Sequence, residues 1–529
     1  MIQTIKRYTN MKKRLIKLII IPALLLATSV GFYACTEKFD ELNTDKTKLT
    51  SLDGSAIGNA FAAAQYRSIQ ASWQTFQSLF ADLQSQYFAN VAINFPSDRN
   101  VMVGGWLNGA WNGFYSNAIP PLLGVLDNTK PGGASENVAV YAMMNIWKVQ
   151  MFLPRTDYWG PIPYSNVGNG LKSVTYDSQE SIYKDFVKIL KEGAASLQAF
   201  KGQNVLGNND QMYGGNVDKW ILFANTMRLR VAMRMSKIDP ALAKTEAESA
   251  AAGGLLSTNA HDGFLAVTQN SLNPMAQATA WNEFRMSAAM ESTLKGYKDP
   301  RMAKYYAPVP GTSNFKGLRN GYSQVQLGDA GNAAGANSNV NERFLPDNQF
   351  TTPFLIMNAA EAHFLKAEGA LKGWNMGGGS AKEFYEMGIE TSMRQWGITD
   401  AAAIQAYISS TTTPIALTTG HLVPSEPISD VPVKWADTPA KQLEQIMTQK
   451  WLALFPNGHE AWAEYRRTGF PKLYPRINSE NPEVPANAVV RRTPYVQGEF
   501  NTNQPGVDSG IKVLGGPDNA ATRLWWDKQ

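Results

Sequence analysis

Apolar side chains recur every three or four residues over most of the chain. Residues 57–91 show this spacing clearly, and it predicts one or two amphipathic helices there. The same spacing predicts further helices over 106–127 (with a break at Pro120 and Pro121), 137–152, 178–197, 218–238, 241–252, 284–296 and 438–463. The chain is therefore expected to be mainly α-helical.

One further pair of predicted helices has small residues where the two would touch. The helices are expected over 354–372 and 381–396, and the first carries Ala359, Ala360 and Ala367 at close-packing positions. Glycines at 377–379 turn the chain between them. Two such helices, over a span somewhat longer than ~34 residues, resemble a tetratricopeptide unit. We therefore expect tetratricopeptide-like helix pairs as the scaffold.

Four stretches lack a helical period. Residues 93–106 are a loop by composition, and the prolines and glycine within 156–165 predict no helix there. Residues 263–347 are rich in Asn, Gly and aromatic side chains and predict a loop-rich insertion. The tail from Pro471 onward is rich in Pro, Asn and Gly and is expected to wrap around the body.

The amino terminus has the pattern of an export signal. A basic segment at 12–14 precedes an apolar run at 18–30, which is too short, at roughly 13 residues, for the ~20 of a membrane-spanning helix. Cys35 is the only cysteine of the chain, and its position resembles that of the lipidated cysteine of bacterial lipoproteins. Phe32 and Tyr33 depart from that pattern. The alternative is a buried free cysteine after an ordinary signal.

The signal also accounts for the basic charge of the chain. We expect a signal peptide at 1–34, a polar tether at 35–50 and a single domain over 51–529. The chain has 49 Lys and Arg against 44 Asp and Glu, and removing the six basic residues of 1–34 leaves 43 against 44. Such a near-neutral body argues against nucleic acid as a partner.

Motifs for catalysis are missing from the sequence. His459-Glu460 begins like a zinc-protease motif, but Ala463 stands where the second histidine is needed. The phosphate-loop and nucleophile-elbow patterns do not occur. Two glycosidase carboxylates can lie far apart in sequence, so a surface glycoside hydrolase stays open as a less favoured alternative. We assign no catalytic residue, no metal ligand and no cofactor.

Several stretches resemble motifs of the SusD/RagB family of nutrient-binding outer-membrane lipoproteins. Residues 156–164 are similar to the family's T-D-x-W-G-x-[IV]-P-Y loop, and residues 213–234 to its Y-G-G-x-x-x-K-W-x-x-F-A-N helix. Residues 299–301 resemble its D-P-R, residues 361–374 its repeat helix, and residues 450–467 its K-W-x-x-L-F-x-N-G-x-E-A-W-x-E-Y-R-R block. The resemblance covers residues 35–475 and includes the lipid signal.

The resemblance implies a fold, a partner and a place. It implies tetratricopeptide-like helix pairs that carry a loop-rich binding face. It also implies a SusC-type TonB-dependent transporter as partner, and an outer-membrane location through a lipid anchor at Cys35, facing the cell surface. It implies no catalysis. The nutrient is expected to be an oligosaccharide, with a peptide as the alternative, because the family binds both kinds of ligand.

Aromatic side chains in loops are the candidate ligand contacts. Aromatic residues on predicted helices, such as Trp147, Trp220 and Trp462, are expected in the core, and Arg228, Arg230, Arg466 and Arg467 in ion pairs. Sugar rings stack on flat side chains, and their hydroxyl groups need amide or charged partners. The loop around 94–111 and the insertion supply both kinds of group. The ligand-binding candidates are Phe95, Arg99, Asn100, Trp106, Asn108, Trp281 and Tyr322.

Overall fold

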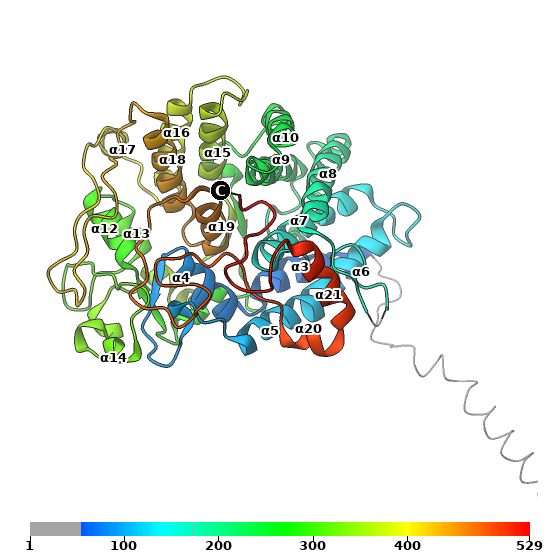
Figure 1. Ribbon diagram of the computed structural model, residues 1–529. Helices are drawn as coiled ribbons and strands as arrows, with labels where there is room; N and C mark the ends of the chain where they lie inside the picture. The colour runs from blue at the N-terminus through cyan, green and yellow to red at the C-terminus, as the bar shows by residue number, and fades with distance from the viewer. Residues whose placement is uncertain (1–53, 172, 529) are drawn as a thin grey trace, which may run out of the picture. The chain divides into compact units, whose positions relative to one another are not determined.

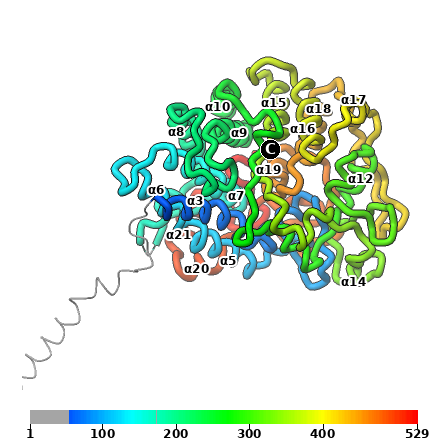
Figure 2. Tube along the Cα trace, turned by 180° about the vertical axis from the view of Figure 1, so that it is seen from behind, coloured from blue at the N-terminus to red at the C-terminus, as the bar shows by residue number. Residues whose placement is uncertain are grey.

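Successive helices pack side by side, as the apolar spacing predicts. The computed structural model describes residues 54–171 and 173–528 (Figure 1). One set of packed helices comprises α7 (Val138–Trp159), α8 (Gln179–Leu197), α9 (Val217–Met235) and α10 (Pro240–Ala252). A second set comprises α15 (Ala359–Leu371), α16 (Ala381–Gln395) and α18 (Pro439–Leu454), which lie together in both views (Figure 2). Contacts between α9 and α15 join the two sets, so the predicted helical scaffold is confirmed.

The amino-terminal helices pack against the first set. They are α3 (Gly54–Gln70), a π-helical segment (Gln74–Ala81), α4 (Asp82–Gln84), α5 (Gly104–Gly113), a second π-helical segment (Phe114–Ala118) and α6 (Ile119–Thr129). Pro120 and Pro121 fall in the first turn of α6, where a missing N–H costs no helical hydrogen bond. Because the second π-helical segment runs directly into α6, the break expected at these prolines is a change from π-helical to α-helical geometry within a continuous helical stretch.

Small residues let the helices approach closely. A Cβ atom added at Gly388 of α16 would lie 2.7 Å from the Phe364 ring of α15, so only glycine fits at this crossing. Ala359, Ala360 and Ala367 of α15 are also fully buried. Trp147, Trp220 and Trp462 are fully buried, which confirms that the helical tryptophans belong to the core.

Several boundaries differ from those predicted, and residues 284–286 of the helix predicted over 284–296 form a strand instead. Helix α7 continues to Trp159, because Pro161 constrains only the residue before it, and the chain turns at Gly160. Residues 354–357 form strand β4 (Phe354–Met357), and α15 starts after Asn358, whose side chain accepts a hydrogen bond from the Glu361 N–H. The predicted helix over 438–463 is two helices, α18 and α19 (Gly458–Thr468).

Two short antiparallel strand pairs hold the insertion. Strand β1 (Phe88–Asn90) pairs with β3 (Phe284–Met286), and β2 (Gly263–Leu265) pairs with β4. The insertion otherwise contains short helices: α11 (Pro274–Thr279), α12 (Ala288–Gly296), α13 (Met302–Tyr305) and α14 (Gln324–Leu327). Another short helix, α17 (Ala401–Ile408), follows α16.

The carboxy-terminal tail runs back over the helices. Thr493 donates its N–H to the Tyr158 carbonyl, and Arg492 donates to the Trp159 carbonyl at 2.9 Å. Helices α20 (Gln497–Thr502) and α21 (Gln504–Leu514) follow, and α20 contacts α5 (Figure 1). The expected wrapping by the tail is confirmed. None of the helices among the described residues is long and apolar enough to cross a membrane.

Buried ion pairs connect helices that are far apart in sequence. Arg230 on α9 forms a two-pronged pair with Glu361 on α15, at 2.5 and 2.7 Å. Arg467 on α19 pairs in the same way with Glu368 of α15. Arg228 pairs with Glu246 of α10. These three arginines confirm the expected ion pairs.

Arg466 differs from them. Its guanidinium donates to the carbonyl oxygens of Asp157 and Arg491 and lies 3.5 Å from the centroid of the Trp462 ring. It is therefore buried among carbonyl groups and an aromatic ring, with Asp157 nearby, instead of forming a direct pair with a carboxylate.

We predict that Gly160→Val destabilises the fold. Gly160 has φ +84°, and an added Cβ would lie 3.1 Å from side-chain carbons of Leu514 and Leu524. A β-branched residue in such a backbone conformation costs on the order of 1–3 kcal/mol, before any clash with the two leucines. Chemical denaturation measures the loss. Gly335→Val is the matched control, since Gly335 has open space around it. An unchanged unfolding free energy for Gly160→Val would refute the prediction.

Candidate functional site

The pairing of β1 with β3 brings two distant loops to one place. Asn90 lies opposite Phe284, and the Val91 N–H donates to the Glu283 carbonyl at 2.8 Å. Because the strands are antiparallel, the loop that follows β1 and the loop that precedes β3 leave from the same end of the pair. The Gln74 amide also donates to both carboxylate oxygens of Glu283, at 2.7 Å each. The loop after β1 and the loop before β3 are therefore held in place at the same end of one strand pair.

Three aromatic side chains from these loops are accessible to solvent: Phe95, Trp106 and Trp281, which we call the aromatic face. The Phe95 and Trp106 rings meet edge to face, with centroids 5.0 Å apart. Trp106 lies in the first turn of α5, whose start at Gly104 follows the loop. Trp281, between α11 and β3, is 48% exposed. An exposed tryptophan of this size is a surface on which an apolar ring face can stack.

Arg99 and Asn100 lie beneath the loop and hold it in shape. Arg99 is 2% exposed, pairs with Glu480 of the tail at 2.5 Å and donates to the Tyr322 carbonyl. Asn100 has φ +63°, and its amide donates to the Val484 carbonyl of the tail. Both side chains are buried and donate hydrogen bonds within the protein, so they position the loop instead of facing a ligand, although the buried Asn100 Oδ1 has no partner among the described residues.

Tyr322 and Asn108 also have structural partners. Tyr322 is 3% exposed and packs in a small apolar cluster with Ala89, Leu318 and Leu327. The Asn108 side-chain oxygen accepts the Gly498 N–H at 2.9 Å and so ties α5 to α20. Of the seven sequence candidates, only the three residues of the aromatic face offer open aromatic surface.

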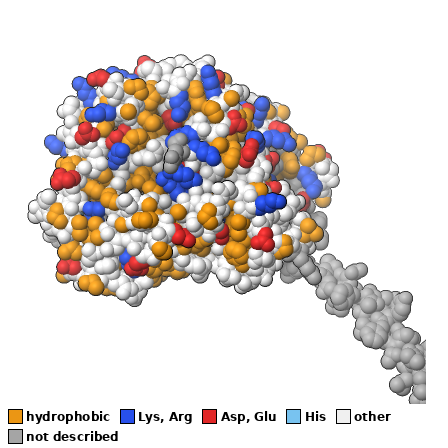
Figure 3. Space-filling view, in the orientation of Figure 1, with side chains coloured by type: hydrophobic (Ala, Val, Ile, Leu, Met, Phe, Trp, Pro, Cys, Tyr) orange, Lys and Arg blue, Asp and Glu red, His pale blue; other side chains and the backbone are white. Residues whose placement is uncertain are grey.

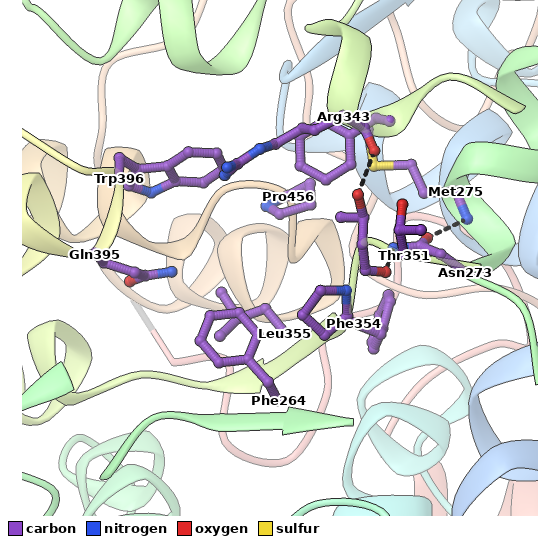
Figure 4. A pocket seen from close by; sticks show the side chains of 13 residues that line it. Phe264, Asn273, Met275, Arg343, Thr351, Phe354, Leu355, Gln395, Trp396 and Pro456 are labelled. Atoms are coloured by element: carbon purple, nitrogen blue, oxygen red, sulfur yellow. Dashed lines mark hydrogen bonds between the residues drawn. The ribbon is translucent and has the colours of Figure 1, made fainter. Parts of the chain in front are cut away.

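A pocket of about 300 Å³ lies next to α11 (Figure 4). Its walls are mainly apolar and come from the insertion, β2, β4 and the end of α16: Phe264, Met275, Phe344, Pro353, Phe354, Leu355, Trp396 and Pro456. The polar lining groups are Asn273, Arg343, Thr351, Thr352 and Gln395. Figure 4 shows the Arg343 guanidinium beside Trp396, and its carbon lies 5.1 Å from the ring centroid.

The pocket and the aromatic face share structural elements. The Trp73 ring packs edge to face on Phe354 of the pocket wall, with centroids 4.8 Å apart, and the next residue, Gln74, holds Glu283. Helix α11 lines the pocket, and Trp281 follows two residues after its end. The sequence did not predict this pocket. Its residues meet only through the pairing of β2 with β4, and the apolar pattern predicted a helix over 354–372 instead of strand β4.

Polar and charged side chains are interspersed with apolar ones over the surface seen in Figure 3. Exposed large apolar residues are scattered over the described part of the chain, and Trp281 is the largest of them. Single exposed apolar residues of this kind are usual on the surface of a folded protein, and Trp281 stands out among them by its size.

The fold and this loop-borne site define a helical, tetratricopeptide-like binding protein, and comparison with known families agrees. Residues 37–527 match the SusD-like family, described as "Susd and RagB outer membrane lipoprotein". The chain belongs to this family of nutrient-binding proteins. The resemblance of the sequence motifs to SusD/RagB proteins is thereby confirmed.

Solved structures of the same family superpose on most of the chain. A chitin-binding SusD homologue from Flavobacterium johnsoniae is 37% identical, covers 89% of this chain and 99% of its own, and has a TM-score of 0.81. A SusD homologue from Bacteroides uniformis is 32% identical over 90% of this chain and 100% of its own, with a TM-score of 0.80. One from Bacteroides vulgatus is 31% identical over 88% and 97%, with a TM-score of 0.80. No protein with a curated description matches the chain.

We predict losses of stability of very different size for two of the sequence candidates. Tyr322→Ala empties a buried aromatic position and should cost ~3–5 kcal/mol of unfolding free energy. Trp281→Ala removes a half-exposed ring and should cost less than ~1 kcal/mol. Denaturant titration of both variants measures the difference. Equal losses would contradict the assignment of Tyr322 to the core and Trp281 to the surface.

Proposed function

We propose that the protein is a cell-surface lipoprotein that captures oligosaccharides and delivers them to a SusC-type TonB-dependent transporter of the outer membrane. The aromatic face is the observation that carries this proposal. Family membership supports a nutrient-binding role, and the relative from Flavobacterium johnsoniae is described as chitin-binding.

The chemistry of the aromatic face suits a sugar chain. Pyranose rings have apolar faces that pack on aromatic side chains, while their hydroxyl groups hydrogen-bond to amides and charged groups. Asn94 and Asn282 are exposed and adjoin Phe95 and Trp281 in sequence, so amide groups are available near these rings. The pocket next to α11, a helix that ends two residues before Trp281, has a volume of about 300 Å³.

Two carboxylates near the face favour binding over hydrolysis. A glycosidase needs a pair of acids flanking the scissile bond, about 5–10 Å apart. Asp98 is 3% exposed and accepts hydrogen bonds from the Asn90 N–H and the Asn320 amide. Glu283 is 8% exposed and accepts both bonds from Gln74. Both acids already serve the structure of the loops.

The lipid anchor and the transporter complete the proposal. Cys35 and the tether at 35–50 lie outside the described residues, and the family description as outer membrane lipoproteins supports acylation at this cysteine. An acylated Cys35 would hold the domain at the outer membrane, facing the cell surface, with the tether giving it reach. There it would pass its ligand to the transporter partner.

We predict that Trp106→Ala weakens oligosaccharide binding by ~1–3 kcal/mol, the size of a well-placed aromatic anchor. Titration calorimetry against a glycan panel that includes chitooligosaccharides measures the loss, with a panel of short peptides as the second arm. Trp374→Ala is the matched control, since Trp374 is a partly exposed tryptophan on the α15–α16 connection. Full affinity in Trp106→Ala would remove this ring from the site, and binding of peptides alone would overturn the glycan assignment.

We predict that Cys35→Ser releases the protein from the membrane. Several acyl chains on one cysteine give stable anchoring, whereas none remains after the substitution. Fractionation of cells of the native host measures the distribution, with the wild-type chain as reference. A Cys35→Ser protein that stays wholly in the outer-membrane fraction after salt washing would rule out anchoring through this residue.

A further inference from the structure

A buried arginine lines a small cavity behind the pocket of Figure 4. Arg155 of α7 is 3% exposed and borders a cavity of about 50 Å³. The cavity shares Phe354 and Leu355 with the pocket next to α11, so these two residues separate the two spaces. Gln150 and Asn457 on its rim are partly exposed and leave a route from solvent.

The charge of Arg155 has no acidic partner. Within the described parts of the chain, no carboxylate lies at ion-pair distance from its guanidinium. One nitrogen donates to the Ser68 carbonyl at 3.4 Å, and the guanidinium carbon lies 4.0 Å and 4.7 Å from the ring centroids of Phe76 and Phe114. Its Nε and Nη1 atoms are buried, without hydrogen-bond partners among the described residues. The two aromatic rings offset only a small part of the free-energy cost of burying the positive charge of the guanidinium.

The nearest acids are engaged elsewhere. Glu460 pairs with Arg234 at 2.5 Å, and Asp157 lies 3.4 Å from the same arginine. Asp82 is fully buried, and burial raises the pKa of its carboxyl well above the usual range, so it contributes little negative charge. Arg155 therefore remains a cation without a counter-charge from the protein.

Two further polar groups of the cavity wall are buried and without partners: Trp73 Nε1 and His459 Nδ1. Indole Nε1 is a donor only. Burial, together with Arg155 and Arg466, lowers the pKa of His459 well below its usual value, so its ring is neutral and can carry its one proton on Nδ1. Three donor groups thus border one cavity: Arg155 of α7, His459 of α19, and Trp73, which directly precedes the first π-helical segment.

We propose that this cavity binds a monovalent anion, a halide or a small carboxylate, held by Arg155 and Trp73 with His459 as a third donor. A charged hydrogen bond to an anion compensates the buried guanidinium directly. A water molecule needs about 10–15 Å³, so the cavity has room for a halide or a carboxylate of two carbons. The bound anion would fix Trp73, whose ring packs on the pocket wall at Phe354.

Anion-dependent stability tests the site. The unfolding midpoint of the purified protein is measured against increasing sodium bromide at constant ionic strength, with sodium gluconate, whose anion is too large for the cavity, as the balancing salt. A second arm uses sodium acetate. We expect a saturable rise of the midpoint with bromide, acetate or both, because ligands that bind only the folded state stabilise it. The arm that saturates at the lower concentration identifies the preferred anion.

Two variants and one control connect the effect to this cavity. Arg155→Met should abolish the saturable rise. Trp73→Phe keeps an aromatic ring in the cavity wall but removes one hydrogen-bond donor. It should raise the half-saturating anion concentration about tenfold. This variant keeps the test decisive if Arg155→Met does not fold. Trp396→Phe is the matched control, because Trp396 Nε1 is also buried and without a partner but borders the other pocket. Its response should equal that of the wild type.

Crystals soaked in bromide show directly whether an anion is bound in the cavity. An anomalous peak within hydrogen-bond distance of Arg155 is the expected result. The proposal is overturned if the midpoint follows ionic strength alone, or if Trp73→Phe and Trp396→Phe respond alike. It is also overturned if crystals soaked in bromide and crystals soaked in acetate both show only water density beside Arg155. These outcomes are independent of oligosaccharide binding, so the proposed function stands or fails separately.

Discussion

A buried network of ion pairs holds the helical frame together. Arg234 of α9 lies among Asp157 of α7 and Glu460 and Glu464 of α19, at 2.5–3.4 Å. Although burial opposes it, Arg467 and Lys450 keep the pKa of Glu464 well below its usual range. Removing one member of such a network leaves an uncompensated buried charge, at a cost of roughly 3–5 kcal/mol. The helices that meet in this network are therefore fixed in their relative positions.

The network also explains why the family motifs predict the fold but not the identity of the nutrient. The residues of the block at 450–467 that resemble the family are the core tryptophans and the paired charges, and Gly458 of the Asn-Gly turn lies directly against Asp82. These groups build the frame. The ligand contacts that we propose lie on loops attached to it, so relatives can share a scaffold while the chemistry of the loops varies.

The sequence predicts the helices well and the site only in part. Helical periods over 178–197 and 218–238 depend on local spacing, and the structure has helices there. The short apolar run at 354–357 fits a helix as well as a strand, and only its pairing with β2 decides. The burial of Arg99 and Asn100 depends on Glu480 and Val484, almost 400 residues later in the chain, and no local pattern contains that information. Loop composition did predict that Trp106 and Trp281 are accessible to solvent, because no helical period requires their burial, and their contact with a ligand stays a prediction.

We propose that an oligosaccharide lies across the aromatic face and reaches towards the pocket next to α11. A crystal structure of the protein with a bound oligosaccharide tests this most directly. We predict a pyranose ring stacked on Trp281 or Trp106, with the chain directed to Arg343 and Trp396. A sugar bound instead in the separate pocket of about 240 Å³ beside Trp111 and Glu499, with the aromatic face uncovered, would contradict the account.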